Sequence, residues 1–169
     1  MTHAAMFGEA RTSDMRERSS ADSAETACVG MGKSWPSYCG AVPTPHLVHH
    51  LGVFASDFAG SEAFYTAALA ALGVQAGYRT EAIAEYWIPE HDAPSLSLET
   101  APTHEDVTRG LHLAFEATNT SAVDAFHRAA VAAGAISRHQ PRYWPEYRAY
   151  AAFVSDPDGN NVEALVKGA

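Results

Sequence analysis

Hydrophobic and polar positions along the chain fall into two regions with different patterning. Residues 1–45 mix charged and small polar residues with scattered alanines, and glycines and prolines crowd the end of this stretch. A segment without sustained periodicity has too little apolar surface to bury, so we predict a disordered N-terminal extension. From residue 46 onward apolar residues recur at strand and helix spacings, which predicts one folded domain over residues 46–169.

The folded region begins with a predicted strand and helix. Residues 46–55 (HLVHHLGVFA) are rich in β-branched and large apolar side chains, which is typical of a strand. Ser56 and Asp57 offer helix-capping side chains, and residues 58–72 then carry apolar positions at helical spacing. Gly73 follows at the position where glycine commonly ends a helix.

The same unit recurs 62 residues later, which is the separation between His50 and His112. Aligned without a gap, residues 50–57 (HLGVFASD) match residues 112–119 (HLAFEATN). The second predicted helix has a start signal of its own in Ser121, with an acidic residue three positions on, and it ends at a glycine. An internal repeat of this size predicts two similar modules that share one structure.

Each predicted helix is followed by strand-like segments. Residues 83–88 and 94–99 predict two strands in the first module. In the second module, residues 150–154 and 161–166 flank the sequence DPDG at residues 156–159, which is a strong turn signal. Each copy therefore reads as a strand, a helix and then several strands.

Three potential metal ligands share this duplicated frame. His50 and His112 hold the same place in the two copies, so packing about a pseudo-twofold axis would bring their imidazoles together. Glu163 alternates with apolar neighbours on the last predicted strand, and a carboxylate on an inner strand face needs compensation. Any one of them alone would be read as a surface residue, whereas their joint placement favours a metal site. Two imidazoles and a carboxylate suit one divalent Fe, Zn, Ni, Co or Mn ion with open positions for substrate.

The motifs HLGV at residue 50, HLAF at residue 112 and DPDGNNVEA at residue 156 resemble the vicinal oxygen chelate superfamily. This superfamily includes glyoxalase I, methylmalonyl-CoA epimerase, extradiol dioxygenases, fosfomycin-resistance transferases and bleomycin-binding proteins. The resemblance covers about residues 46–167, and the last motif is its most specific part.

The resemblance implies an α+β fold of two βαβββ modules, at about residues 46–101 and 108–168, that form an incomplete β-barrel around a metal site. Carried over by motif, the three ligands fall on His50, His112 and Glu163. The resemblance also implies a homodimer. Module exchange between chains occurs in this superfamily, which leaves open a metal site completed across a subunit boundary.

One position departs from the pattern of glyoxalase I and the epimerase. Those enzymes use a fourth ligand, Glu or Gln, on the last strand of the first module, and the equivalent position here is Ser97. Glu99 lies two residues further along the same strand. It could act as the fourth ligand only if the register of this strand shifted. The three-ligand pattern is closer to that of the dioxygenases and the fosfomycin transferases.

The segment RYWPEYR, which precedes the last hairpin, is aromatic and cationic. As a loop over the metal it would offer Tyr143 or Tyr147 as a proton donor or substrate clamp. Arg142 or Arg148 would then hold an anionic group of the substrate. The alternative is a surface loop whose aromatic residues pack on the sheet edge. Trp87 holds the matching place in the first module and is a candidate stacking platform or a core residue.

We therefore expect a metal-dependent enzyme that acts on a small oxygen-bearing metabolite through bidentate or enolate-type coordination. Lyase, isomerase and dioxygenase chemistry all remain open. The alternative is a drug- or metabolite-sequestering protein of the bleomycin-resistance type. Turnover, and its loss when His112 is replaced, would separate an enzyme from a binding module.

The charge and composition of the chain limit the classes of partner that we expect. The formal net charge of -9 and the lack of a Lys/Arg cluster argue against nucleic acid as a partner. No apolar run approaches the ~20 residues of a membrane-spanning helix, so no membrane partner is expected. The two cysteines, Cys28 and Cys39, both lie in the predicted N-terminal extension and do not read as a disulfide framework, so we expect a cytoplasmic location.

Overall fold

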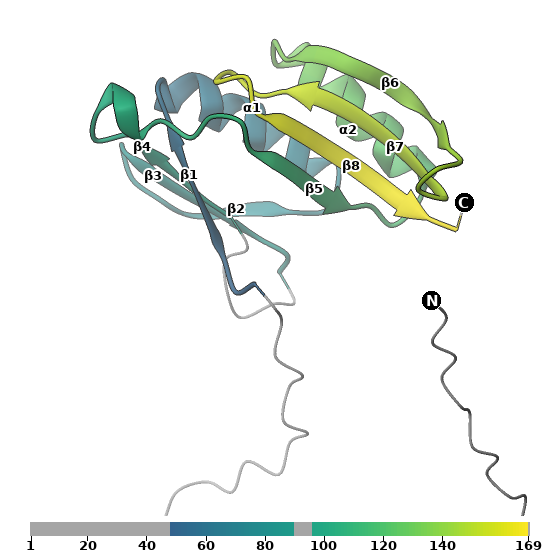
Figure 1. Ribbon diagram of the computed structural model, residues 1–169. Helices are drawn as coiled ribbons and strands as arrows, with labels where there is room; N and C mark the ends of the chain where they lie inside the picture. Colours follow the sequence, from purple (N-terminus) through teal and green to yellow (C-terminus); the bar gives the residue numbers. More distant parts are fainter. Residues whose placement is uncertain (1–47, 90–95, 169) are drawn as a thin grey trace, which may run out of the picture. The chain divides into compact units, whose positions relative to one another are not determined.

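The computed structural model describes residues 48–89 and 96–168, and the predicted N-terminal extension and the predicted turn near residue 91 lie outside the described residues. The first module comprises β1 (Leu51–Ala55), α1 (Phe58–Ala70), β2 (Gln75–Arg79), β3 (Ile83–Trp87) and β4 (Leu96–Thr100) (Figure 1). A connection containing the short 3-10 helix η1 (His104–Asp106) leads to the second module. That module comprises β5 (His112–Glu116), α2 (Thr120–Ala132), β6 (Ile136–Trp144), β7 (Ala149–Ser155) and β8 (Asn161–Lys167). The fold is therefore α+β with two βαβββ modules, as the sequence predicts.

Each module forms its own four-stranded sheet, with strand orders β1-β4-β3-β2 and β5-β8-β7-β6. In both sheets the first strand pairs in parallel with the last, and the remaining pairs are antiparallel. Gly52 pairs with Ser97 in the first sheet, and Ala114 pairs with Glu163 in the second. This register confirms the alignment of the two copies and the equivalence of Ser97 and Glu163. Within the described residues the two sheets do not close into a barrel around a site.

The helix ends follow local capping chemistry. Asp57 caps α1, as predicted, and its side chain accepts a hydrogen bond from a backbone amide of the first turn. The Asn119 side chain caps α2 by accepting a hydrogen bond of 2.9 Å from the amide of Ala122. The predicted start at Ser121 is therefore wrong, because the asparagine two residues earlier satisfies the free amides first. No helix in residues 48–89 or 96–168 combines the length and apolarity needed to cross a bilayer.

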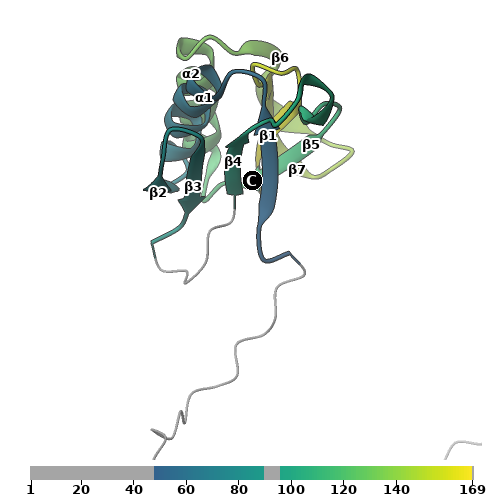
Figure 2. The same ribbon diagram turned by 90° about the vertical axis from the view of Figure 1, so that its left-hand side faces the viewer.

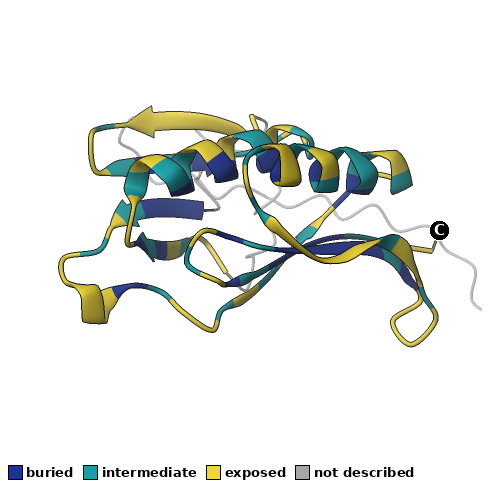
Figure 3. Cartoon of the chain, turned by 90° about the horizontal axis from the view of Figure 1, so that it is seen from above, coloured by how far each residue is buried: buried dark blue, intermediate teal, exposed yellow. Residues whose placement is uncertain are grey.

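One hydrophobic core joins the two modules. Helices α1 and α2 contact each other and lie on the same side of the strands (Figure 2), and their inner residues are buried (Figure 3). Leu96 and Leu98 of β4 share this core with Val162 and Ala164 of β8. Because side chains alternate along a strand, Ser97 and Glu163 project from the opposite face of each sheet. We call that face, directed away from the helices, the open face.

A buried polar cluster also links the modules. Asp156, 5% exposed, follows β7, and its carboxylate accepts hydrogen bonds from the Tyr65 hydroxyl of α1 and the Asn160 side chain, both at 2.9 Å. Burial, followed by the charge of Asp156, raises the pKa of Tyr65, so this hydroxyl keeps its proton and donates. At the edge of the cluster, the Ser56 hydroxyl donates to Asp158 at 2.5 Å. The DPDG turn therefore fixes the second module against the first.

We expect Tyr65→Phe to lower the free energy of unfolding by about 1–3 kcal/mol, because it removes a buried donor from a carboxylate. Urea denaturation followed by circular dichroism measures this change. Tyr78→Phe is the matched control, since Tyr78 is 57% exposed and should change stability by less than about 0.5 kcal/mol. Equal effects of the two substitutions would contradict the structural role assigned to Asp156.

Candidate functional site

Two of the three predicted ligands meet on the open face of the second sheet. His112 begins β5, and Glu163 lies on the neighbouring strand β8. The His112 Nε2 atom is 2.9 Å from Glu163 Oε2. The glutamate is 7% exposed, whereas more than half of the histidine side chain is exposed. A carboxylate buried to this degree needs a compensating partner, and His112 supplies it among the described residues.

The separation of these two atoms fits a shared metal ion. Nitrogen and oxygen ligands lie about 2.0–2.2 Å from a transition metal, so two ligands at right angles are about 3 Å apart. The 2.9 Å distance between His112 Nε2 and Glu163 Oε2 therefore matches one edge of a coordination polyhedron. The accessible side of the histidine leaves room for further ligands. By chemistry and spacing, this pair fits two of the positions of a divalent metal.

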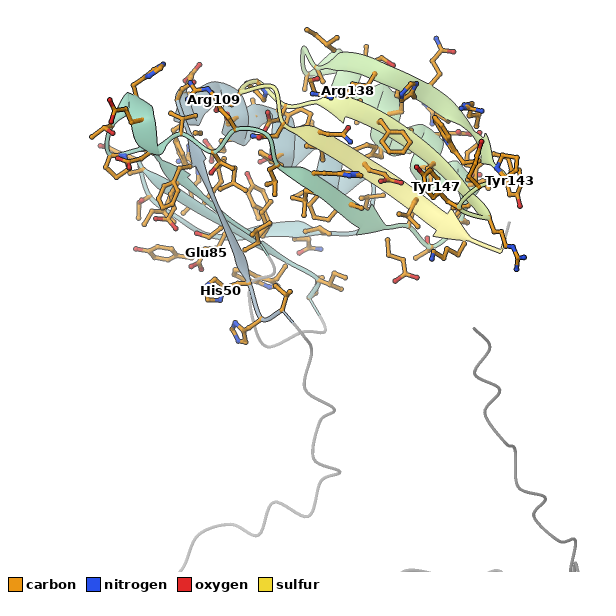
Figure 4. The ribbon with its side chains drawn as sticks, viewed as in Figure 1. His50, Glu85, Arg109, Arg138, Tyr143 and Tyr147 are labelled. Carbon is orange, nitrogen blue, oxygen red and sulfur yellow. The ribbon has the colours of Figure 1, made fainter. Side chains whose placement is uncertain are left out.

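The third predicted ligand, His50, lies elsewhere in the same chain. Figure 4 shows it on the first module, at the start of β1 and far along the molecule from Tyr147. It precedes the strand by one residue, so strand alternation does not separate it from His49, and their Nδ1 atoms are 2.9 Å apart. In the parts of the chain that the structure describes, no third His, Cys, Asp or Glu joins His112 and Glu163. The role of His50 as a ligand stays a prediction.

A pocket of about 460 Å³ opens around the pair, which is within the usual range for small-molecule sites. Glu163 lies at one end of its floor, and Leu165 and Lys167 follow on the same face of β8. Phe153 of β7, 7% exposed, lies directly across from Glu163. The remaining lining residues come from the start of β5, the β6–β7 connection and the start of β7: His112, Glu146, Tyr147 and Ala149. His112 and Glu163 therefore lie at one end of the pocket, Lys167 lies near the other, and Phe153, Leu165 and Ala149 supply the apolar part of the lining.

Only part of the predicted RYWPEYR loop is a loop. Its first three residues belong to β6, and the turn after Trp144 carries Tyr147 into the pocket lining. Tyr143 is 46% exposed and is not among the lining residues (Figure 4). The Arg142 guanidinium lies over the Trp144 ring, 3.5 Å from its centre, which is a cation–π contact rather than a free anion site. Arg148 is exposed, adopts a positive φ of 50° and does not line the pocket.

Aromatic rings lie beside the His112–Glu163 pair. The Phe153 ring lies 6.2 Å from the His112 ring and 5.2 Å, edge to face, from the Trp144 ring. His139 packs edge to face against both Phe153 and Trp144. These contacts anchor Phe153 as a rigid apolar wall next to His112.

On the first module, Trp87 packs across β2. A side chain at Gly77 would collide with the Trp87 ring, so the ring lies directly on the backbone of that strand. Ser97 occupies the position equivalent to Glu163, and its hydroxyl donates to Glu99 Oε1 at 3.1 Å. The open face of the first sheet therefore carries Trp87, Ser97 and Glu99, apart from the pocket of the second sheet in the same chain.

The sequence reasoning missed the pocket residues Phe153, Leu165, Lys167 and Glu146. Two of them carry a readable signal, since Leu165 and Lys167 follow Glu163 at intervals of two along one strand. Phe153 required the hairpin register, which pairs it with Glu163.

Comparison with known proteins places the chain in a family. The sequence profile of the Glyoxalase/Bleomycin resistance protein/Dioxygenase superfamily matches residues 47–164, and the chain belongs to this superfamily. Metal binding is common among its members. No protein of curated function matches the chain in sequence.

Solved structures of the same superfamily share the fold. A glyoxalase/bleomycin resistance protein from Albidiferax ferrireducens T118 is 29% identical, with a TM-score of 0.62, over 72% of this chain and 99% of that chain. A glyoxalase-related enzyme from Fulvimarina pelagi is 20% identical, with a TM-score of 0.57, over 73% and 89% of the two chains. A lactoylglutathione lyase from Agrobacterium tumefaciens is 20% identical, with a TM-score of 0.51, over 72% and 94%.

We expect Glu163→Gln to raise the free energy of unfolding of the metal-free protein by about 1 kcal/mol. The amide keeps the shape and still accepts a hydrogen bond from His112, but it removes the cost of a buried charge. Urea denaturation in the presence of a chelator measures the change, with Glu81→Gln on the exposed β2–β3 turn as the matched control. A destabilised Glu163→Gln variant would show instead that the carboxylate is retained for folding.

Proposed function

We propose that the chain is a metal-dependent enzyme acting on a small oxygen-bearing molecule in the pocket beside His112 and Glu163. The observation that carries this proposal is the 2.9 Å approach of His112 Nε2 to the buried Glu163 carboxylate. A protein gains little stability from such an arrangement, because burying a charge beside an exposed histidine costs more than a surface ion pair returns. The presence of the pair is better explained by a ligand that both side chains bind.

We further propose that His50 of the partner subunit completes the ligand set in a homodimer. Within one chain the helix-side core orients both open faces away from the shared helices, so the first module does not cover the pocket of the second. A twofold axis would place the open face of each first sheet against the second sheet of the other chain. Two equivalent sites would result, each built from His50 of one subunit and the His112–Glu163 pair of the other.

We assign the residues around the pocket to three roles: metal binding, substrate orientation and proton transfer. His112, Glu163 and the partner's His50 would hold one divalent metal, which supplies Lewis-acid stabilisation of negative charge on a substrate oxygen. Phe153 and Leu165 provide apolar walls that orient the substrate body and limit water. Tyr147 lies in the pocket lining with its hydroxyl available for proton transfer, which favours it over Tyr143 for that role.

A sequestering protein is the second candidate. The apolar lining by Phe153, Leu165 and Ala149, with an exposed Tyr147 at the edge, suits retention of a planar ligand without chemistry. In that case ligand affinity would be independent of His112 and Glu163.

Elemental analysis of protein purified without chelator tests the ligand set. We expect about one transition metal per chain in the unmodified protein and a loss of at least ~10-fold in metal affinity for His50→Ala and for His112→Ala, because each removes one of three ligands. His49→Ala is the matched control and should keep its metal. A protein without metal, even after reconstitution, would favour the sequestering candidate.

Mixing the two histidine variants tests the shared site. In a heterodimer of His50→Ala and His112→Ala chains, one site loses both residues and the other keeps its complete ligand set. We expect differently tagged, co-purified heterodimers to bind about one metal per dimer with the affinity of the unmodified protein, although each variant alone binds metal at least ~10-fold more weakly. No recovery in the heterodimer would mean that the ligands come from one chain.

A further inference from the structure

The pocket beside His112 and Glu163 follows strand β8. Glu163, Leu165 and Lys167 all line it, and they succeed one another at intervals of two residues on the open face of that strand. Each residue of a strand advances about 3.3 Å, so the Cα atoms of Glu163 and Lys167 are separated by about 13 Å. A ligand that fills the pocket therefore has one end at the His112–Glu163 pair and the other end at Lys167.

The lining between these two ends is apolar. Leu165 lies midway between them on β8. On the neighbouring strand β7, Phe153 pairs with Glu163 and Ala149 pairs with Lys167, and both line the pocket. None of the side chains of Leu165, Phe153 and Ala149 carries a hydrogen-bonding group. We therefore expect an apolar body in any ligand that bridges the two ends.

Lys167 brings a positive charge to the far end of the pocket. It is the only lysine in residues 46–169, and the described pocket lining contains no arginine. It forms no salt bridge with any residue that the structure describes. The two arginines predicted to hold an anionic group lie elsewhere, since Arg142 covers the Trp144 ring and Arg148 does not line the pocket. Lys167 is therefore the lining residue suited to that group.

Glu146 is the second charged residue at this end. It belongs to the turn before β7, and the Gly168 amide donates to the Arg148 carbonyl at 3.4 Å, which holds this turn beside the end of β8. Glu146 and Lys167 line the same pocket without forming a salt bridge with each other. An exposed carboxylate is screened by water and salt, so we expect Glu146 to weaken the binding of an anion rather than to prevent it.

We propose that Lys167 binds a carboxylate of the substrate at the end of the pocket away from the metal, an inference that rests on the proposed function. The substrate class is then an elongated molecule with metal-binding oxygens at one end, an apolar body and a carboxylate at the other end. A single ammonium group beside a glutamate suits a singly charged carboxylate better than a doubly charged phosphate. Lys167 determines specificity in this arrangement and takes no part in the chemical step.

Two hydroxamic acids of equal chain length test this role on the cobalt-loaded protein. Both bind metals through two oxygens, but suberic acid monohydroxamate ends in a carboxylate and octanohydroxamic acid ends in a methyl group. Isothermal titration calorimetry gives the Kd of each. We expect Lys167→Gln to bind the carboxylate probe at least about 3-fold more weakly than the unmodified protein does, with the affinity for octanohydroxamic acid unchanged, because only the first probe loses an ion pair. This loss should shrink as the salt concentration rises.

Glu146→Gln is the matched control at the same end of the pocket. It removes a negative charge, so it should strengthen binding of the carboxylate probe and leave that of octanohydroxamic acid unchanged. Equal weakening of both probes by Lys167→Gln, or no weakening of either, would overturn the role of Lys167 while leaving the metal site in place. Weaker binding of the carboxylate probe by Glu146→Gln would overturn it too. If the unmodified protein binds no cobalt, or if its cobalt form binds neither probe, the proposed function fails and this inference fails with it.

Discussion

The buried carboxylate of Asp156 fixes the turn and the strand that position the candidate site. It accepts four hydrogen bonds, from the Tyr65 hydroxyl, the Asn160 side chain and the backbone amides of Asp158 and Asn160. A charge removed from water is tolerated only when its oxygens are satisfied in this way. The same bonds close the turn from which β8 starts, and Glu163 lies on that strand. Turn chemistry and site chemistry are therefore coupled through a single short motif.

The same turn also fixes the orientation of the second module relative to the first. Asn160 donates to the Thr108 carbonyl and accepts from the Leu111 amide, which ties the connection between the modules to the final hairpin. The two helices pack on each other, and the apolar sides of both sheets are buried in the same core. The open faces are left without a partner in the same chain. The packing that stabilises the monomer is thus the reason that the proposed ligand set includes a residue of a second copy.

The sequence predicts the structural features that depend on local chemistry. It does not predict those that depend on the packing of distant segments. The cap at Asp57, the DPDG turn and the equivalence of His50 and His112 are readable because neighbouring residues determine them. Strand β6 lacked a signal: Pro141 and a run of charged, exposed residues hide its pairing with β7. The meeting of His112 with Glu163 follows from alternation and register. The distance of His50 from them depends on the angle between modules, which no local pattern encodes.

Duplication explains why one site can contain unlike halves. If the two copies had kept identical open faces, a twofold dimer would bring together two carboxylates at the Ser97 and Glu163 positions, where like charges repel unless a metal binds all of them. Here the first copy has a serine at that position and a carboxylate one strand away, at Glu85, whereas the second has Glu163 beside Phe153. In the proposed site the second copy would then hold the metal beside the apolar Phe153 ring. In the proposed dimer the first copy would contribute only the His50 imidazole to the metal, so that this repulsion is avoided.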